Sequence, residues 1–237
     1  MNDILIENCL NIYRFGSIVY ETNNINSDED YIVVLKDNSI YIPDDINIQC
    51  FTKEQFIFAI YNHDIQVLEC LFLSESNIIK QDIDFSKYFD LNLNNLRKSI
   101  STISSKSWVK GKKKLIISAD YDKYLGIKSI FHSLRIIDFG IQIGLHGKIT
   151  NYSSMNWLWF ELLKLYEKYD RNELWDVISD RYKSLNNEKH SKFKILSPKE
   201  NNDYSKILLK INKKYNYCMN NECFNEILEL LENKNDL

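Results

Sequence analysis

The amino-acid sequence predicts an α+β protein in which a small mixed β-sheet with flanking helices precedes a mainly helical domain. Short apolar runs bounded by turn residues are confined to the first seventy residues, and such runs are typical of strands. Beyond residue 90 the apolar positions recur with helical spacing. With 44% hydrophobic residues, six glycines and two prolines, the chain can bury a core of this kind. We therefore expect an α/β domain at residues 1–90 and a helical domain at residues 91–237.

In the first domain we expect a short helix at residues 2–10, followed by strands. The run at 28–35 ends in four consecutive apolar residues, as in a strand that is buried on both faces. Thr52 and Gln55 have the spacing of a capping box, which predicts a helix that begins directly after the last strand. The expected strands are residues 11–15, 28–35, 39–42 and 46–51.

The rest of the chain has the periodicity of helices. An apolar segment at 65–73 comes first, and several longer amphipathic segments follow. The largely polar segment 184–202, which contains Pro198, is the best candidate for a linker. The expected helical segments of the second domain are 96–103, 124–145, 157–169, 174–182, 204–215 and 224–231.

Charge, cysteine content and hydropathy exclude several classes of protein. The 30 basic and 33 acidic side chains give a net charge of −3, which excludes a polybasic protein but permits a local basic groove. The five cysteines are odd in number and lack metal-type spacing, so we expect reduced thiols in a cytoplasmic protein. Residues 1–16 lack the pattern of a signal peptide, and no window has the roughly 18 consecutive apolar residues that span a bilayer. We therefore expect no membrane partner.

The segment that carries chemistry lies between residues 15 and 30. An expected strand ends at Gly16-Ser17, and Asp28 and Asp30 open the next strand. Gly16 would let the backbone approach a phosphate, while Ser17 and the first amides of a following helix would donate to it. Asp28 and Asp30 project from the same strand face, and two adjacent carboxylates favour a divalent cation between them. The pattern predicts a site for a metal ion and a phosphate.

This pattern resembles the DNA polymerase β-like nucleotidyltransferase superfamily, whose signature pairs a Gly-Gly or Gly-Ser corner with two acidic residues on the next strand. More narrowly it is similar to predicted nucleotidyltransferases associated with RNA repair. A second block at 46–72 and a third, with Lys128, His132, Arg135 and Gly147, are in the family's order, so the resemblance covers roughly residues 11–150. The matching residues of the first block are Gly16, Ser17, Tyr20, Thr22, Ser27, Asp28 and Asp30.

The resemblance implies an NTP substrate, Mg²⁺ or Mn²⁺ held by Asp28 and Asp30, and RNA as one candidate acceptor. Catalysis would use these two aspartates together with Asn47. Lys128, His132 and Arg135 are spaced i, i+4 and i+7, so one helical face could carry them to the phosphates, with Arg135 as the strongest contact. The residues implied in nucleotide binding are Gly16, Ser17, Tyr20, Thr22, Ser27, Lys128, His132 and Arg135.

Two positions depart from the family pattern. Glu21 stands where the family has a glycine after the tyrosine, which changes the turn on the phosphate side. Asn47 occupies the place of the third metal-binding carboxylate; its amide oxygen can coordinate a metal but cannot act as a base. Asp45, two residues away on the same strand face, is a candidate substitute. Three hypotheses follow: an active nucleotidyltransferase, a catalytically weakened module that binds a nucleotide or RNA, and an antitoxin-like interaction protein.

Other features have two interpretations each. The basic cluster at 106–114, which includes Trp108, fits either a contact with single-stranded RNA or a solvated loop. Glu69, in an apolar segment, fits either a buried partner of a cation or a surface charge. Tyr20 fits either a core aromatic or a ligand contact, and Trp157 and Trp159 fit a helical core.

Overall fold

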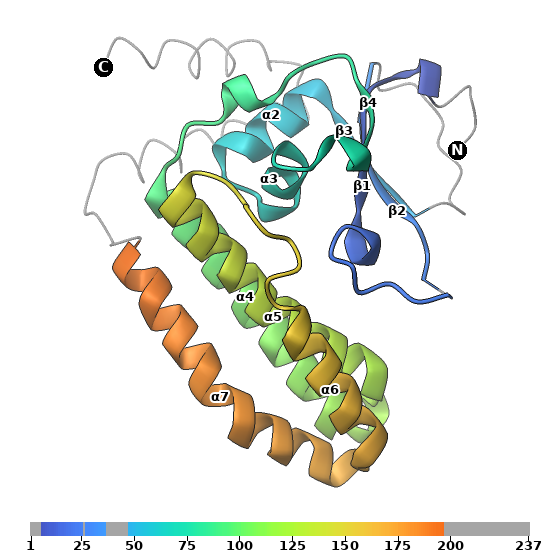
Figure 1. Ribbon diagram of the computed structural model, residues 1–237, viewed down its shortest axis with the longest axis vertical. Helices are drawn as coiled ribbons and strands as arrows, with labels where there is room; N and C mark the ends of the chain where they lie inside the picture. The colour runs from blue at the N-terminus through green and yellow to red at the C-terminus, as the bar shows by residue number, and fades with distance from the viewer. Residues whose placement is uncertain (1–5, 26, 37–46, 197–237) are drawn as a thin grey trace. The chain divides into compact units, whose positions relative to one another are not determined.

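The computed structural model describes residues 6–25, 27–36 and 47–196, and all of them belong to one compact unit that spans Met1–Pro198. The described part has the expected α+β class, with a small mixed sheet near the N-terminus and helices after it (Figure 1). The strand order is β3-β2-β1-β4, with β1 antiparallel to β2 and β4, and β2 parallel to β3. The strands are β1 (Cys9–Phe15), β2 (Asp30–Leu35), β3 (Ile48–Thr52) and β4 (Ile78–Gln81).

The sheet is centred on β2, whose apolar run is buried as the sequence predicts. Ile32, Val33 and Val34 are completely buried between β1 and β3. Helices α2 (Lys53–Tyr61) and α3 (Ile65–Leu71) contact the sheet, and the ring of Phe56 on α2 stacks on Tyr13 at 5.8 Å. Parallel pairing of β2 with β3 sets the register on which the candidate site depends.

The predicted capping box is confirmed at the start of α2. The Thr52 hydroxyl accepts a hydrogen bond from the backbone N–H of Gln55 at 3.1 Å, and the Gln55 side chain accepts one from the N–H of Thr52 at 2.9 Å. These two bonds satisfy backbone donors that the first turn of a helix leaves without partners. The end of β3 is thereby fixed to the start of α2.

In the described part of the chain four longer helices follow the sheet, and the first two of them approach each other closely at Gly111 and Gly126. A Cβ atom built on Gly111 would lie 2.8 Å from the Ile130 side chain, and one on Gly126 would lie 2.6 Å from Leu115. The lack of a side chain at both glycines therefore permits this close crossing, because a Cβ atom at either position would force Ile130 or Leu115 to move. The four helices are α4 (Leu93–Ile116), α5 (Lys123–His146), α6 (Asn156–Lys168) and α7 (Arg171–Leu196).

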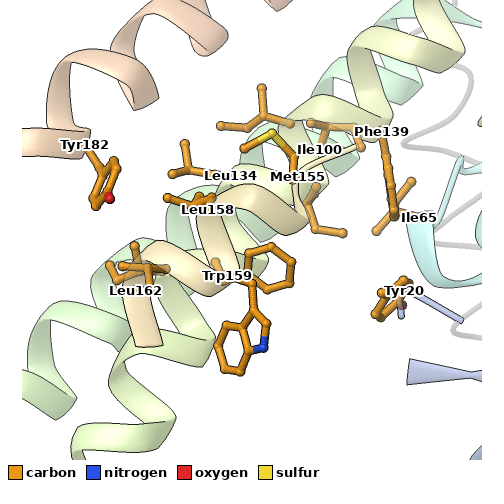
Figure 2. Packing of buried hydrophobic residues seen from close by; sticks show 14 of the residues in the cluster. Tyr20, Ile65, Ile100, Leu134, Phe139, Met155, Leu158, Trp159, Leu162 and Tyr182 are labelled. Carbon is orange, nitrogen blue, oxygen red and sulfur yellow. The ribbon is translucent and has the colours of Figure 1, made fainter. Parts of the chain in front are cut away.

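One hydrophobic cluster connects the N-terminal part with the helices. Leu134 and Phe139 of α5 belong to this cluster together with Leu158 of α6, and the same cluster includes Tyr20 and Ile65 (Figure 2). The cluster therefore includes residues on both sides of the boundary expected at residue 90. The division into domains at that residue stays a prediction.

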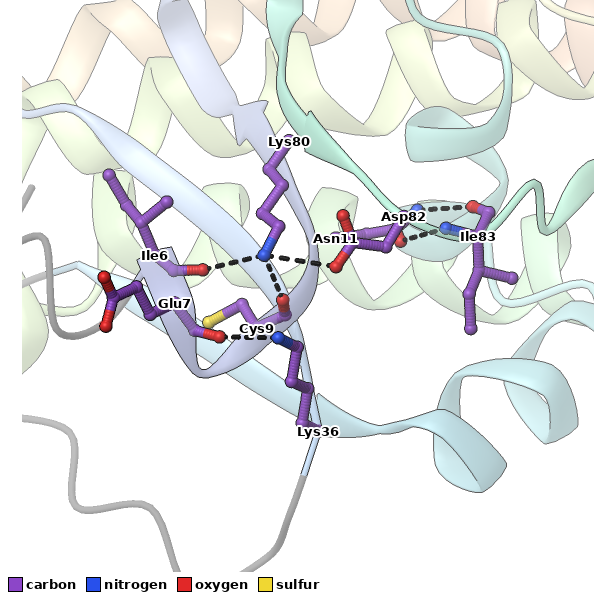
Figure 3. Close-up of polar contacts among 8 residues, drawn as sticks. All are labelled: Ile6, Glu7, Cys9, Asn11, Lys36, Lys80, Asp82 and Ile83. Carbon is purple, nitrogen blue, oxygen red and sulfur yellow. Dashed lines mark hydrogen bonds and ion pairs between the residues drawn. The ribbon is translucent and has the colours of Figure 1, made fainter.

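Polar contacts fix the edge strand β4, which the sequence analysis missed. The Lys80 ammonium donates to the carbonyl of Cys9 at 2.7 Å and pairs with Asp82 at 3.1 Å (Figure 3). The Asn11 amide donates to the carbonyl of Ile83 at 2.8 Å and accepts from its N–H at 3.1 Å. Because the contacts of Lys80 with Cys9 and of Asn11 with Ile83 join residues about 70 positions apart, no local pattern in the sequence reveals this strand.

Two expectations about the helical part are wrong. The polar segment after residue 184 is not a linker up to residue 196, because α7 continues to Leu196. Phe193 is completely buried, and Lys189 pairs with Asp138 of α5 at 2.6 Å, so a few contacts hold a mostly polar helix. The basic cluster at 106–114 is not a loop, since it lies within α4.

The remaining expectations concern boundaries and undescribed segments. β1 begins at Cys9, two residues before the expected strand and within the helix expected at 2–10. Of the helices that the structure describes, none has the length and apolar character that crossing a bilayer requires. The strand expected at 39–42 and the helices expected at 204–215 and 224–231 lie outside the described residues.

Candidate active site

A cavity of about 370 Å³ lies between the turn that follows β1 and one face of α5. Its lining contains every residue implied in nucleotide binding, together with Asp30. Two segments that are about 100 positions apart in sequence therefore meet in one cavity. The predicted residues that line it are Gly16, Ser17, Tyr20, Thr22, Ser27, Asp30, Lys128, His132 and Arg135.

Gly16 forms the corner at which the strand end meets the acidic edge. Its φ of +79° lies in the left-handed region, and a Cβ atom at this position would stand 2.2 Å from the Asp30 carboxylate oxygen Oδ2. Glycine is required here for both reasons. The close neighbour of Gly16 is thus the carboxylate of Asp30, whereas the sequence analysis reserved this space for a phosphate.

The helix expected after Ser17 is wrong in extent, because only a single 3₁₀ turn, Gly16–Ile18, follows β1. The chain then continues as a compact turn in which the N–H of Thr22 donates to the carbonyl of Ser17 at 2.9 Å. A phosphate at this corner would meet the Ser17 hydroxyl and turn amides, with little contribution from a helix dipole.

The acidic edge is built from neighbouring positions on β2 and β3. Asn47 directly precedes β3, and its carbonyl accepts from the N–H of Tyr31 at 2.9 Å, which extends the parallel pairing and sets Asn47 beside Asp30. Asp30 and Asn47 line a second depression of about 400 Å³ on this edge. The structure thus places Asn47 next to Asp30, while metal binding by Asn47 stays a prediction. Asp45 lies outside the described residues.

The electrostatics of Asp30 fit a cation at this edge. Burial raises the pKa of Asp30, the nearby carboxylate of Asp28 raises it further, and the Lys128 ammonium opposes both effects. A divalent cation would relieve this unfavourable charge. Asp28 is exposed and does not line either cavity. Among the described residues no three His, Cys, Asp or Glu side chains gather into a metal-type group. The oxygen donors that the structure brings to one depression are the Asp30 carboxylate and the Asn47 amide, whereas Asp28 precedes β2 and lies outside that depression.

The wall across the cavity is basic and comes from two helices. Lys128 and Arg135 lie on α5, and Lys110 joins them from α4. His132 lies between these charges, and its pKa is lowered to about 3, first by burial and then by Arg135, Lys110 and Lys128. Its Nδ1 is 2.9 Å from Nη2 of Arg135, which has only protons to donate. His132 is therefore neutral with its proton on Nε2, and it can donate one hydrogen bond.

Arg135 uses its guanidinium differently from the expected phosphate contact. It is only 5% exposed, and its Cζ lies 3.4 Å from the centroid of the Tyr20 ring, which is a cation–π contact. Its Nε is buried without a hydrogen-bond partner among the described residues. In this arrangement Arg135 contributes charge to the cavity wall and supports Tyr20 and His132.

Glu69 and Tyr20 form a buried pair beneath the cavity. The Tyr20 hydroxyl donates a hydrogen bond to the Glu69 carboxylate, and Glu69 is only 1% exposed. Burial raises the pKa of Glu69 to about 7, although the charge of Arg135 and the hydrogen bond from Tyr20 both lower it. Of the two interpretations of Glu69, the surface charge is wrong, because the side chain is buried. Its hydrogen-bond partner is the Tyr20 hydroxyl, and the charge of Arg135 acts on it electrostatically. Tyr20 is both a core residue and a lining residue of the cavity.

The sequence analysis missed several lining residues. Lys110 and Ser107 come from the basic cluster on α4, and their spacing on one helical face was the available signal. The aromatic residues Tyr124, Phe131 and Trp159 also line the cavity. Trp108, which was considered for RNA stacking, instead packs against Trp175 with ring centroids 6.1 Å apart.

Comparison with known proteins adds no assignment, since no protein-family model matches the chain and no curated protein matches it significantly.

Proposed function

We propose that this protein is a metal-dependent nucleotidyltransferase, which moves a nucleoside monophosphate from an NTP to a hydroxyl acceptor. The observation that supports this best is one cavity in which an acidic edge at Asp30 faces a basic wall at Lys128 across the Gly16 corner. A metal–triphosphate complex has the complementary charges, with a cation for the acidic edge and phosphates for the basic wall.

The metal ligands would be the carboxylates of Asp28 and Asp30 and the amide oxygen of Asn47. When bound, Mg²⁺ or Mn²⁺ would neutralise phosphate charge and lower the pKa of the acceptor hydroxyl. Because the Asn47 amide cannot take a proton, we take Asp28 and Asp30 as the candidate protein bases for that hydroxyl.

The phosphates would be held by the corner and the basic wall. Ser17 donates a hydroxyl hydrogen bond, Lys128 and Lys110 supply charge, and the neutral His132 donates through Nε2. With the triphosphate fixed, the acceptor oxygen attacks the α-phosphorus while the bond to the β-phosphate oxygen breaks, and pyrophosphate leaves.

The acceptor could be an RNA end, a protein hydroxyl or a small molecule. One feature favours a polyanion such as RNA: Lys106, Lys110 and Lys113 follow one face of α4 and line a depression of about 500 Å³. Lys110 also lines the main cavity, so this basic face is continuous with the proposed NTP site.

A second candidate function is a nucleotide-binding module with weak or no turnover. Asn47 favours it, because an amide in place of a carboxylate removes one negative charge from the metal site. An antitoxin-like interaction protein remains a hypothesis without a specific supporting observation.

The deciding experiment incubates the full chain with each labelled NTP, Mg²⁺ or Mn²⁺, and either total RNA or total protein. We expect label in one acceptor fraction, its loss in Asp30→Asn, and an increase in Asn47→Asp. Asp90→Asn is the matched control, because Asp90 is exposed and lies outside these cavities. Saturable NTP binding without transfer, in wild type and Asn47→Asp alike, would favour the second candidate. Absence of both binding and transfer would refute both.

A further inference from the structure

The N-terminal end of α5 contributes an aromatic region to the cavity. Tyr124 and Leu125 line the cavity about one helical turn before Lys128, which is about 6 Å along the helix axis. Trp159 reaches the same cavity from α6, and Phe131 reaches it from α5. The cavity therefore has a charged region and an adjoining apolar, aromatic region.

The aromatic rings are held in fixed positions, with one of them open to solvent. Trp159 is 5% exposed and contacts Phe131 and Tyr124, with ring centroids 5.3 Å and 6.0 Å away. Tyr124 also contacts Tyr166 edge-on at 6.3 Å, yet it remains 40% exposed. The buried ring of Trp159 and the partly buried ring of Tyr166 thus orient Tyr124, while 40% of Tyr124 stays exposed at the cavity.

We propose that Tyr124, supported by Trp159, stacks on the base of a purine nucleotide whose phosphates bind at Lys128. This inference rests on the proposed function and adds the class of NTP. A planar base joined to a polyanion through a ribose matches an aromatic platform about one helical turn from a lysine. A purine is favoured because its larger ring system overlaps more of the platform, and stacking tolerates both adenine and guanine.

The test measures Kd by calorimetry for Mg·ATP, Mg·GTP, Mg·UTP and Mg·tripolyphosphate, the last of which has no base. For wild type we expect ATP and GTP to bind with similar affinity and more tightly than UTP and tripolyphosphate. Tyr124→Ala should weaken ATP binding about tenfold, since base–aromatic stacking is worth that order of affinity, and should leave tripolyphosphate binding unchanged. Lys128→Ala should weaken the binding of both ATP and tripolyphosphate.

Phe160→Ala is the matched control, because Phe160 is adjacent to Trp159, 54% exposed and outside the cavity. If Tyr124→Ala does not fold, Tyr124→Leu replaces it, because leucine keeps an apolar side chain but has no aromatic face. The comparison of nucleotide and tripolyphosphate affinities in the wild type does not depend on any variant. Equal wild-type affinity for ATP and tripolyphosphate would overturn the base site while leaving the phosphate site standing. No binding of any ligand would refute the proposed function as well.

Discussion

Replacing Glu69 by glutamine should make the stability of the protein less sensitive to pH between about pH 4.5 and pH 7. In the wild type the buried Glu69 carboxyl accepts a hydrogen bond from the Tyr20 hydroxyl, and burial raises the pKa of Glu69 from 4.5 to about 7. The folded state therefore holds the Glu69 proton more tightly than the unfolded state. The resulting stabilisation is fully present below pH 4.5 and is lost as the pH rises through about 7. Glutamine has a similar shape and no proton to lose.

The magnitude follows from the two pKa values. Between pH 5 and pH 8 the wild type should lose about 2–3 kcal/mol of unfolding free energy that Glu69→Gln retains. Effects of the substitution that do not depend on pH, such as an altered contact with Arg135, cancel when the difference between the two proteins is compared at the two pH values. The other titrating groups cancel in the same way.

The assay is urea unfolding of both proteins at pH 5 and pH 8, followed by tryptophan fluorescence. The control is Glu75→Gln, which makes the same chemical change at an exposed side chain. Its unfolding free energy should change between pH 5 and pH 8 by nearly the same amount as that of the wild type. If the difference between wild type and Glu69→Gln is the same at both pH values, Glu69 does not carry a raised pKa. The description of a buried, partly protonated pair would then be wrong.

Three further predictions concern the site and its frame. Gly16→Ala should reduce stability by about 1–2 kcal/mol, because position 16 has a positive φ, and thermal unfolding measures this loss. The new side chain should also displace Asp30 and abolish Mg·ATP binding, which calorimetry measures. Unchanged binding would contradict the geometry of the Gly16 corner. Bound tripolyphosphate should raise the pKa of His132 from about 3 toward its ordinary value, because the phosphate charge offsets the surrounding cations. An NMR titration with and without tripolyphosphate measures this pKa, and an unchanged pKa would show that the ligand binds elsewhere. Thr52→Ala should lose about 1 kcal/mol on urea unfolding, whereas Thr52→Ser should retain most of it.

Features encoded by neighbouring residues could be predicted from the sequence. The apolar run of β2 and the capping box at Thr52 are local, as is the helical spacing of α5, and each lies where the sequence indicates. Features that depend on distant partners could not be predicted. β4 is held by Lys80 and Asn11, and the polar end of α7 is held by Lys189 and Phe193.

The same distinction applies to the candidate site. Spacing on one face of α5 predicted that Lys128 and His132 would point the same way, and both line the cavity. It could not predict that Arg135 would stack on Tyr20, because that contact depends on how α5 packs against the turn after β1. The contribution of Lys110 depends likewise on the close crossing of α4 and α5. Nucleotide binding by these residues stays a prediction.

The asparagine at position 47 is consistent with the charge balance of the acidic edge. Asp30 is partly buried and already lies near Asp28, and both conditions raise its pKa. A carboxylate at position 47 would add a third negative charge to this edge and increase the repulsion whenever no cation is bound. An amide avoids that repulsion and still offers an oxygen ligand, although it attracts a cation less strongly. Asn47 thus favours a stable metal-free protein at the expense of metal affinity, so a nucleotidyltransferase built on this edge should depend on the metal that the nucleotide itself carries into the cavity.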